Sequence, residues 1–419
     1  METAAKKKLL VYSDCYVYGG SERLLPPLIL NPAILAEYEI HFAYRRYPAY
    51  EAGLADDYGS KRKNFHPLFA LSNETLFYNI STSSWPSLAK SAAKIPFWCL
   101  QKSGFYLLCN FLVMRAFVKK IGPDIVHVNN GGYPAAKSCF AFVLAAKSAG
   151  VKNIVYQVNN IASVPKTKLS VWIDQEIINK DVNYFITASL KAREALAKNR
   201  NFSLDKIVNV PSAVFNKAAT VSKEQILKEF SWPVDSFLLC EVAFLSERKG
   251  QVFLLKAIKD IELKNPDLFK KLRLIFVGDG EEEGILKKFV HDNDLGAHVA
   301  FAGYRADRLN FINACDVFVL PSIANEDMPI VILEAMSMGK AIIASDFAGI
   351  KEELENGVSG ILVEPDAKTL PTDLARAILD IYGNGIVTYG PNAKKRFDEY
   401  FSVERYGRRL IEVYNSMNE

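Results

Sequence analysis

The feature that most constrains the fold is an alternation of short apolar runs with longer segments of helical period. This alternation is typical of βαβ units, in which parallel strands form a sheet and the intervening helices cover it. The chain has 419 residues and two series of such runs. Because domains usually contain about 100 to 200 residues, a chain of this length predicts more than one core. We therefore expect two α/β domains.

The first series contains five expected strands, at 9–12, 39–44, 125–128, 154–157 and 184–187. Its expected helices cover 22–36, 135–148 and 190–198. The second series contains six expected strands, at 237–242, 272–277, 299–302, 317–320, 341–344 and 361–363. These series predict domains at 1–211 and 212–400. The remaining segment, 401–419, is expected to be a helix that either caps the second sheet or returns to the first domain.

Composition excludes several classes of protein. A formal net charge of +4 gives no concentrated basic footprint, so we expect no nucleic-acid partner. The six cysteines are scattered, without the close pairs of a zinc site or the density of a disulfide scaffold, which favours reduced thiols in the cytoplasm. No apolar stretch reaches the length of about 18 residues expected of a transmembrane helix. We expect no metal ion and no bound cofactor.

One segment, from Pro321 to Gly339, carries most of the expected chemistry. It follows an expected strand, and ligands of open α/β sheets bind beyond the carboxyl ends of the strands. Pro329 and Gly339 suit the beginning and the end of a helix. The first turn of that helix would offer free backbone N–H groups to a phosphate.

Two glutamates in this segment, Glu326 and Glu334, stand eight positions apart. Glu334 lies on an apolar helix, where a carboxylate is costly to bury without a partner. A ribose diol is one partner, because a carboxylate accepts two hydrogen bonds side by side. An internal salt bridge, for example to Lys340, is the alternative.

The surrounding motif resembles the donor site of family 4 glycosyltransferases of GT-B fold. The residues that carry the likeness are Pro321-Ser322, Glu326-Asp327-Met328-Pro329, Leu333-Glu334-Ala335-Met336 and Gly339-Lys340-Ala341-Ile342-Ile343-Ala344-Ser345-Asp346. The likeness covers nearly the whole chain and is densest from Glu241 to Pro365. It implies two Rossmann-like domains facing a central cleft. It also implies a retaining, metal-independent hexosyltransferase that uses a UDP or GDP sugar as donor.

The resemblance assigns roles to residues of the second domain. Glu334 would hold the ribose hydroxyls, and Glu326 would contact the transferred sugar. Arg248 and Lys249 would neutralise the diphosphate. The residues that would form the rest of the donor site are Gly278, Gly280, Tyr304, Ser322, Asp327, Met328, Pro329, Ile330 and Val331.

Three positions of the first domain are expected at the site. Gly19 and Gly20 follow the first strand and would let the backbone approach the donor phosphates. His127, at the end of a later strand, is either catalytic or a buried structural histidine. Several family members have a second histidine where this chain has Asn129, whose amide could orient the sugar or the acceptor.

The chain also departs from the family pattern at Ala243-Phe244, where an arginine is common. With Asn129, this change supports an alternative, a catalytically silent GT-B relative that binds a nucleotide sugar or a partner glycosyltransferase. An epimerase or an inverting transferase fits the spacing of Glu326 and Glu334 less well. A dinucleotide oxidoreductase ranks last, since a full Gly-x-Gly-x-x-Gly is missing after the first strand.

The acceptor is expected to be a glycan, lipid-linked and used in cell-surface polysaccharide or glycolipid synthesis. The segment from Trp85 to Lys120 interleaves lysines with aromatic residues. Such a pattern is typical either of a helix that docks on an anionic membrane or of a core helix with a solvated lysine edge. The first interpretation predicts a cytoplasmic protein in peripheral contact with the inner face of the plasma membrane.

Overall fold

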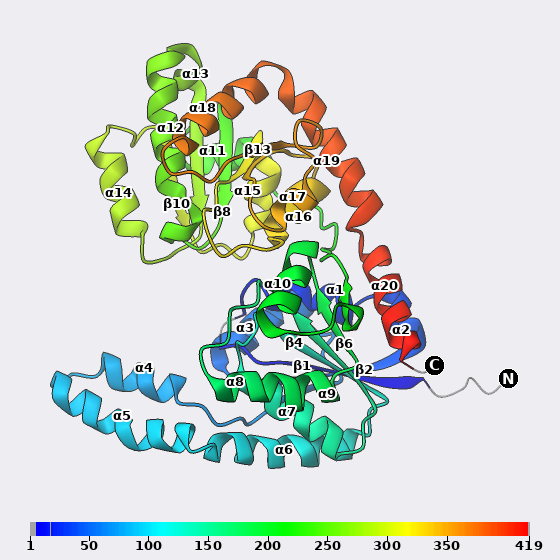
Figure 1. Cartoon of the computed structure of the whole chain (residues 1–419). Helices are drawn as coiled ribbons and strands as arrows, with labels where there is room; N and C mark the ends of the chain where they lie inside the picture. Colours follow the sequence, from blue (N-terminus) through cyan, green and yellow to red (C-terminus); the bar gives the residue numbers. More distant parts are fainter. Residues whose placement is uncertain (1–5, 17, 418–419) are drawn as a thin grey trace. The chain divides into compact units, whose positions relative to one another are not determined.

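The computed structural model describes residues 6–16 and 18–417, which form two compact units (Figure 1). The first unit contains the chain up to Thr187, then Arg193–Asn209, and the end of the chain from Gly407. The second unit contains Ala188–Ala192 and Val210–Tyr406. The domain ranges expected from the sequence also include residues 1–5, 17, 418 and 419, which lie outside the described residues.

The first unit is built on a parallel sheet of seven strands in the order β3-β2-β1-β4-β5-β6-β7. The strands are β1 (Lys7–Ser13), β2 (Tyr38–Arg45), β3 (Phe65–Leu68), β4 (Ile125–Asn130), β5 (Asn153–Val158), β6 (Tyr184–Thr187) and β7 (Ile207–Asn209). The five expected strands are all present. The two edge strands, β3 and β7, were not predicted because runs of three or four residues show no periodicity.

Helices precede and follow these strands. They are η1 (Glu22–Leu24), α1 (Pro26–Ile29), α2 (Pro32–Glu37), α3 (Pro48–Tyr58), α4 (Glu74–Thr82), α5 (Ser87–Lys102), α6 (Phe105–Ile121), α7 (Lys137–Ser148), α8 (Lys168–Ile173), η2 (Asp174–Ile178), α9 (Asn179–Asp181), α10 (Leu190–Arg200) and η3 (Leu204–Lys206). The single helix expected at 22–36 is wrong. Pro26, Pro27 and Pro32 divide it into η1, α1 and α2, since proline lacks the N–H that would continue a helix.

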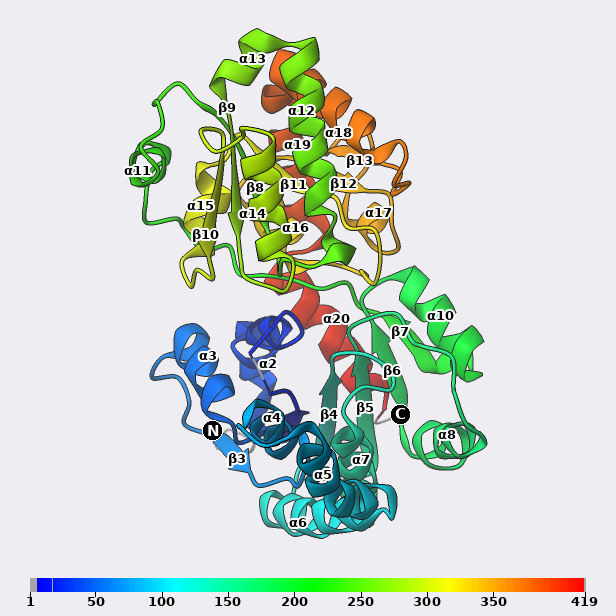
Figure 2. The ribbon, with the colours of Figure 1, turned by 90° about the vertical axis from the view of Figure 1, so that its left-hand side faces the viewer.

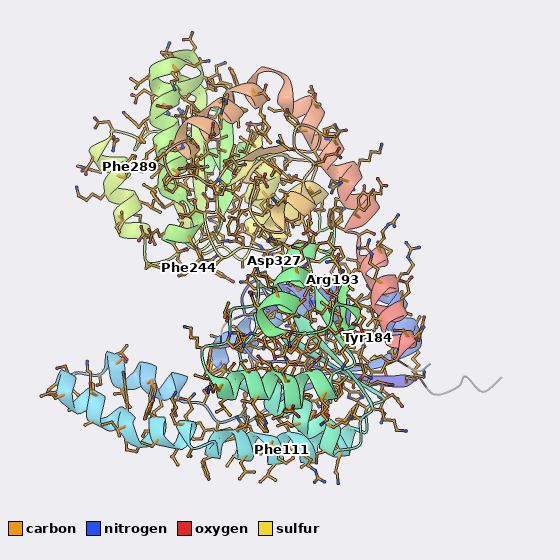
Figure 3. The ribbon with its side chains drawn as sticks, viewed as in Figure 1. Phe111, Tyr184, Arg193, Phe244, Phe289 and Asp327 are labelled. Atoms are coloured by element: carbon orange, nitrogen blue, oxygen red, sulfur yellow. The ribbon has the colours of Figure 1, made fainter. Side chains whose placement is uncertain are left out.

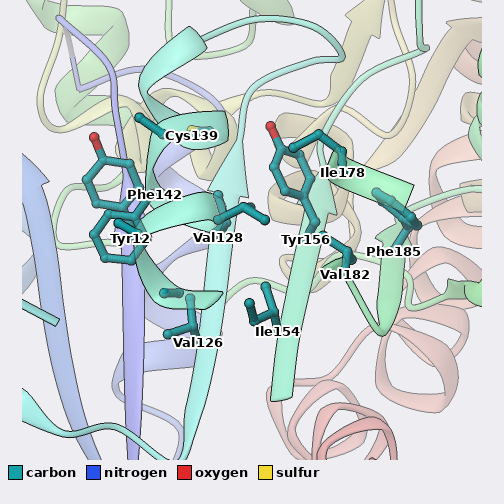
Figure 4. Packing of buried hydrophobic residues seen from close by; sticks show 14 of the residues in the cluster. Tyr12, Val126, Val128, Cys139, Phe142, Ile154, Tyr156, Ile178, Val182 and Phe185 are labelled. Atoms are coloured by element: carbon teal, nitrogen blue, oxygen red, sulfur yellow. The ribbon is translucent and has the colours of Figure 1, made fainter. Parts of the chain in front are cut away.

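The core of the first unit lies between the sheet and α7 (Figure 4). Tyr12 of β1 stacks on Phe142 of α7 with ring centroids 4.0 Å apart. Val126 and Val128 of β4 belong to the same buried cluster as Tyr156 of β5. Alternate residues of each strand therefore cover one face, as the pleat of a strand requires.

The second unit is built on a parallel sheet of six strands in the order β10-β9-β8-β11-β12-β13. The strands are β8 (Phe237–Val242), β9 (Leu272–Val277), β10 (Val299–Gly303), β11 (Val317–Leu320), β12 (Ala341–Ser345) and β13 (Ile361–Val363). Each agrees with its expected range to within about one residue, because a buried parallel strand is a continuous apolar run. The predicted GT-B class of fold is thus confirmed for both sheets.

Figure 2 shows the helices around this sheet. They are α11 (Lys223–Glu229), η4 (Glu247–Lys249), α12 (Gln251–Lys264), α13 (Pro266–Lys271), α14 (Glu283–Asp292), α15 (Arg308–Ala314), α16 (Ile330–Ser337), α17 (Ile350–Glu353), α18 (Leu370–Asp380), η5 (Ile381–Gly385) and α19 (Ile386–Tyr400). Helices α12, α14 and α18 share one hydrophobic core with the strands, whereas α15, α16 and α19 pack in a second group.

The last helix, α20 (Val403–Ser416), clusters with the first unit from Gly407 on. A Cβ at Gly407 would lie 2.3 Å from Oδ1 of Asn31, so only glycine permits this close approach. The ring of Tyr414 packs edge-to-face on Tyr38 at a centroid distance of 5.6 Å. Across the described residues, no helix has the length and apolar character needed to cross a bilayer.

Candidate functional site

The strand order locates the candidate site of the second unit. From β8 the chain adds β9 and then β10 on one side of the sheet, and it adds β11, β12 and β13 on the other side. The loops that follow β8 and β11 therefore leave the sheet in opposite directions. In open α/β sheets such a switch point is where ligands bind. The corresponding point of the first unit lies between β1 and β4.

The loops after β8 and β11 contact each other at two points. Gly250 has φ +76°, and a Cβ there would lie 2.1 Å from the carbonyl oxygen of Pro321. The backbone N–H of Ile323 donates to the carbonyl oxygen of Arg248 at 2.8 Å. These contacts hold the basic pair Arg248 and Lys249 beside the loop that carries Glu326.

Glu326 is buried and receives hydrogen bonds from three side chains. Lys249, also buried, forms an ion pair with Oε1 of Glu326. The partly exposed Arg248 donates to the same oxygen at 2.9 Å, and the hydroxyl of Ser322 donates at 3.4 Å. The two cations expected at a diphosphate thus converge, in this structure, on the carboxylate expected at the sugar. Paired charges compensate for burial that neither would tolerate alone.

Glu334, on the adjacent helix α16, is buried against a cation that the sequence did not suggest. Arg308, the first residue of α15, donates from Nε to Oε2 at 3.2 Å and from a terminal nitrogen to Oε1. Lys340 instead donates to the carbonyl oxygen of Asn313. The salt bridge considered as the alternative to a ribose contact therefore exists, with a different partner. The only sequence signal for it was a carboxylate on an apolar helix.

The first turn of α16 lies where the motif predicted a helix N-terminus. The helix begins one residue later than expected, because Pro329 is its N-cap, with φ −73° and ψ 117°. The cap has no side-chain hydrogen bond to the first turn. Met328 and Ile330 are buried, while Pro329 and Val331 are half-buried.

A group of acidic side chains adjoins this turn. Asp327 is buried, accepts a hydrogen bond from the Ser189 hydroxyl, and leaves Oδ2 without a partner among the described residues. Burial raises the pKa of Asp327 to about 7, and the charges of Glu352 and Glu326 add to this rise. Glu353 is fully buried, and neither of its oxygens accepts a hydrogen bond from a described residue. Burial, followed by the charge of Asp327, raises the pKa of Glu353 well above its ordinary range.

The sequence did not indicate the environment of Glu353, which lies in the charged run Lys351-Glu352-Glu353 and looks solvated there. Glu352 instead accepts hydrogen bonds from the backbone N–H groups of Leu190 and Lys191, at 2.8 and 3.1 Å. Glu241, at the end of β8, was also missed as a buried carboxyl. Its Oε1 accepts from Gln251 at 2.9 Å, and burial raises its pKa.

Gly278 and Gly280 allow the loop after β9 to touch the loop after β8. Their φ angles are +142° and +158°, and a Cβ at either would lie about 2 Å from the carbonyl oxygen of Ala243 or Leu245. The close approach that these glycines allow is thus between two backbone segments. Phe244 and Tyr304 are exposed, and Figure 3 shows Phe244 at the same end of the unit as Asp327.

In the first unit, Gly19 and Gly20 lie between β1 and η1. A Cβ at Gly20 would meet no atom within 4 Å. The long helix that was expected to follow is a 3-10 turn of three residues, so the argument for a phosphate at a helix N-terminus does not hold here. The Ser21 hydroxyl instead donates to the buried Glu22 at 2.6 Å.

His127 and Asn129 lie on β4, where His127 is in the middle of the strand rather than at its predicted end. Both lie in a buried polar network that reaches the carboxylate of Glu22 through Ser13. Nε2 of His127 donates to Oε1 of Gln157 at 2.9 Å, which leaves Nδ1 to accept from the Tyr414 hydroxyl at 2.7 Å. Burial lowers the pKa of His127 to about 4. Asn129 donates to the Ser13 hydroxyl at 3.0 Å. This geometry suits a structural histidine, and the catalytic roles of His127 and Asn129 remain predictions.

The described residues contain no group of three or more His, Cys, Asp or Glu side chains arranged to hold a metal ion. Comparison with known proteins identifies the family. Residues 222–400 match the family model of glycosyl transferases group 1. The chain carries a group 1 glycosyltransferase domain. The predicted family is thereby confirmed for these residues.

Relatives that are named as glycosyltransferases extend the match beyond that domain. The chain is 26% identical over 312 residues to an uncharacterized glycosyltransferase of Methanocaldococcus jannaschii, covering 71% of this chain and 76% of the relative. It is 29% identical over 279 residues to the Escherichia coli UDP-Gal:alpha-D-GlcNAc-diphosphoundecaprenol alpha-1,3-galactosyltransferase, covering 64% and 70%. The crystal structure of Anabaena HepE in complex with UDP superposes with a TM-score of 0.73 at 19% identity, covering 98% and 100% of the chains.

Proposed function

We propose that this glycosyltransferase transfers a hexose or an N-acetylhexosamine, with retention of configuration, from a UDP or GDP sugar to a glycan acceptor. The observation that carries the proposal is the pair of buried carboxylates, Glu326 and Glu334, beyond the carboxyl ends of the strands of the second sheet. Each has its own cationic partner there. The names of the E. coli relative and of the Anabaena complex, which include UDP-galactose and UDP, support a nucleotide-sugar donor.

In this proposal Glu334 binds the ribose hydroxyls. Each carboxylate oxygen accepts more than one hydrogen bond, so the ribose can bind while Arg308 keeps Glu334 oriented. The exposed ring of Tyr304 flanks the base, and the backbone from Asp327 to Val331 binds the sugar and phosphate. Gly19 and Gly20 approach the donor from the first unit.

Arg248 and Lys249 stabilise the negative charge that develops on the departing diphosphate. Their pairing with Glu326 holds both cations at the carboxyl edge before the donor arrives. The acceptor hydroxyl attacks on the face from which the diphosphate leaves, and a phosphate oxygen takes its proton. The scheme uses no enzymatic nucleophile, no metal ion and no cofactor, because positioning and charge supply the catalysis.

We propose a lipid-linked acceptor and a place of action in the cytoplasm at the inner face of the plasma membrane. The E. coli relative is named for an acceptor carried on diphosphoundecaprenol. A lipid-linked acceptor suits polysaccharide or glycolipid synthesis at a membrane. A catalytically silent relative is the competing hypothesis, and its support is the two departures from the family pattern at Ala243-Phe244 and at Asn129.

The test is a turnover assay in which the protein is incubated with a panel of UDP and GDP sugars and an extract of lipid-linked glycans. Release of nucleoside diphosphate is followed, and the anomeric configuration of the product is read by NMR. We expect one donor to be consumed and its configuration retained. Binding of a nucleotide without consumption of any sugar would establish the silent relative, and an inverted product would overturn the mechanism.

A further inference from the structure

The segment that forms α4, α5 and α6 has an unusual charge pattern. Residues 75–123 contain six basic side chains and no aspartate or glutamate, although acidic residues make up 47 of the 419 in the chain. The basic residues are Lys90, Lys94, Lys102, Arg115, Lys119 and Lys120. Glu74, the first residue of α4, and Asp124 therefore bound a stretch of the chain without any carboxylate that could neutralise them.

Helix α5 has no buried residue. Leu88, Ile95 and Trp98 are exposed, and their spacing of seven and then three positions places them on one face of the helix. Lys102 extends that face at the end of α5. Figure 1 shows α4 and α5 reaching out beyond the sheet of the first unit. An exposed apolar face of this kind marks an interaction surface.

Helix α6 has two different faces. Met114 and Val118 are buried in the core that contains α7, and Phe111 packs partly against it (Figure 3). Phe105, Leu108 and Leu112 lie on a different face of α6 and are exposed. Together with Leu88, Ile95 and Trp98 of α5, their side chains expose between 47% and 84% of their surface. Lys119 and Lys120 follow on α6 and are exposed as well.

We propose that α5 and α6 form a docking surface for an anionic lipid bilayer. Their leucine, isoleucine, phenylalanine and tryptophan side chains would enter the region between headgroups and acyl chains, where tryptophan is favoured. Their lysines would contact the anionic headgroups. A second copy of the chain is a poorer occupant, because two such surfaces would bring lysines together without any carboxylate to pair with them.

Docking through this surface would bring the protein to the membrane that holds the proposed lipid-linked acceptor. The surface consists of residues that the donor site does not use, so it does not depend on nucleotide binding. The two hypotheses can therefore fail separately.

The experiment is flotation of the full chain with vesicles of phosphatidylcholine alone or of an equal mixture with phosphatidylglycerol. We expect binding to the anionic vesicles only, and weaker binding as salt rises. The double variant Ile95→Glu, Leu112→Glu should lose binding. A matched control, Leu263→Glu, changes an exposed leucine of the second unit and should bind as the wild type does.

A second variant tests the charges without disturbing the apolar faces. Reversing Lys102, Lys119 and Lys120 to glutamate should weaken binding by more than about 100-fold, since losing each lysine near an anionic surface costs about fivefold and each new carboxylate is repelled. Reversing the exposed Lys368 and Lys395 is the control. Circular dichroism verifies that each variant is folded.

Three results would overturn the proposal: no flotation with anionic vesicles, equal flotation with neutral vesicles, or unchanged flotation of both α5–α6 variants. A dimer in sedimentation analysis that the double variant abolishes, with no lipid binding, would assign the surface to a second copy instead. Vesicle binding without any nucleotide binding would contradict the proposed function and still support the docking surface.

Discussion

The carboxyl edges of the two sheets have the same topology and different buried chemistry. At the switch point of the second unit, Glu326 and Glu334 are held by lysine and arginine. At the switch point of the first unit, His127 and Asn129 are held by hydroxyl and amide groups. The first unit also has buried charges beside the end of β1, where Ser13 donates to Glu22 at 3.3 Å and Asp14 pairs with Arg45. The difference therefore lies in the expected site residues, which are paired charges in the second unit and neutral groups in the first.

This comparison shows that the fold fixes the place of a site and the side chains fix what binds there. Paired charges at the second edge suit a charged ligand such as a nucleoside diphosphate, because the partners are already in place. His127 and Asn129 of the first unit need no counter-ion, because neutral partners inside the unit satisfy their hydrogen bonds. Asp174 and Arg200 form a buried ion pair in the first unit, and neither is an expected site residue.

The largest expected effect comes from Glu326→Gln. This variant keeps the shape of the side chain and removes the charge that holds Arg248 and Lys249, so we expect turnover to fall by about 10²- to 10³-fold. The measurement is kcat for the consumed donor. The control is Asp174→Asn, which weakens a buried ion pair of the first unit and should reduce stability with little change in kcat per folded molecule. Equal losses of kcat in both variants would contradict the distinction between the two edges.

The two edges should also respond to pH in opposite directions. Asp327 has its folded pKa raised to about 7, so it stabilises the second unit at low pH, and this stabilisation is lost as the pH rises from its ordinary value near 4 through 7. His127 has its folded pKa lowered to about 4, so it stabilises the first unit above its ordinary pKa near 6.5, and this stabilisation is lost as the pH falls towards 4.

At about 1.4 kcal/mol per unit of pKa shift, each group should change the free energy of unfolding by about 3 to 4 kcal/mol over its range, with Asp327 at the upper end. Hydrogen exchange followed by mass spectrometry between pH 4 and pH 8 resolves the two units. Asp327→Asn should reduce the loss of protection in the second unit at high pH, and Glu353 accounts for part of what remains. If both units lost protection in the same direction, the contrast would be wrong.

A smaller effect distinguishes the glycines of the two edges. Gly278→Ala should lower the free energy of unfolding by about 2 kcal/mol, because its Cβ would lie 1.9 Å from the carbonyl oxygen of Ala243. Gly20→Ala should change it by less than about 0.5 kcal/mol, since a Cβ there meets open space. Urea denaturation measures both. A raised KM for the donor in Gly20→Ala, with stability unchanged, would support the predicted approach of this loop to the phosphates.

The sequence predicted the strands, which depend on local apolar patterns. It missed the side-chain contacts between residues that are far apart in the chain. All eleven expected strands are present, because apolar runs between helical segments leave few other folds. The single helix expected at 22–36 is divided into three short ones, because its apolar residues have helical spacing but its prolines interrupt the helix. Arg308 was missed because helix packing, rather than spacing, brings it to Glu334, 26 positions later. His127 could not be judged from the sequence, because its partner Tyr414 lies 287 positions away.

The central claim is that the carboxylates at the edge of the second sheet form a nucleotide-sugar site. The most direct measurement is the thermal shift produced by UDP and by GDP in the wild type, in Glu334→Ala and in Asp174→Ala. A ligand at about 100 times its Kd stabilises the folded state by about 2.7 kcal/mol. We predict a shift with one nucleotide in the wild type and in Asp174→Ala, and its loss in Glu334→Ala. A shift that persisted in Glu334→Ala, or no shift with either nucleotide in the wild type, would contradict the claim.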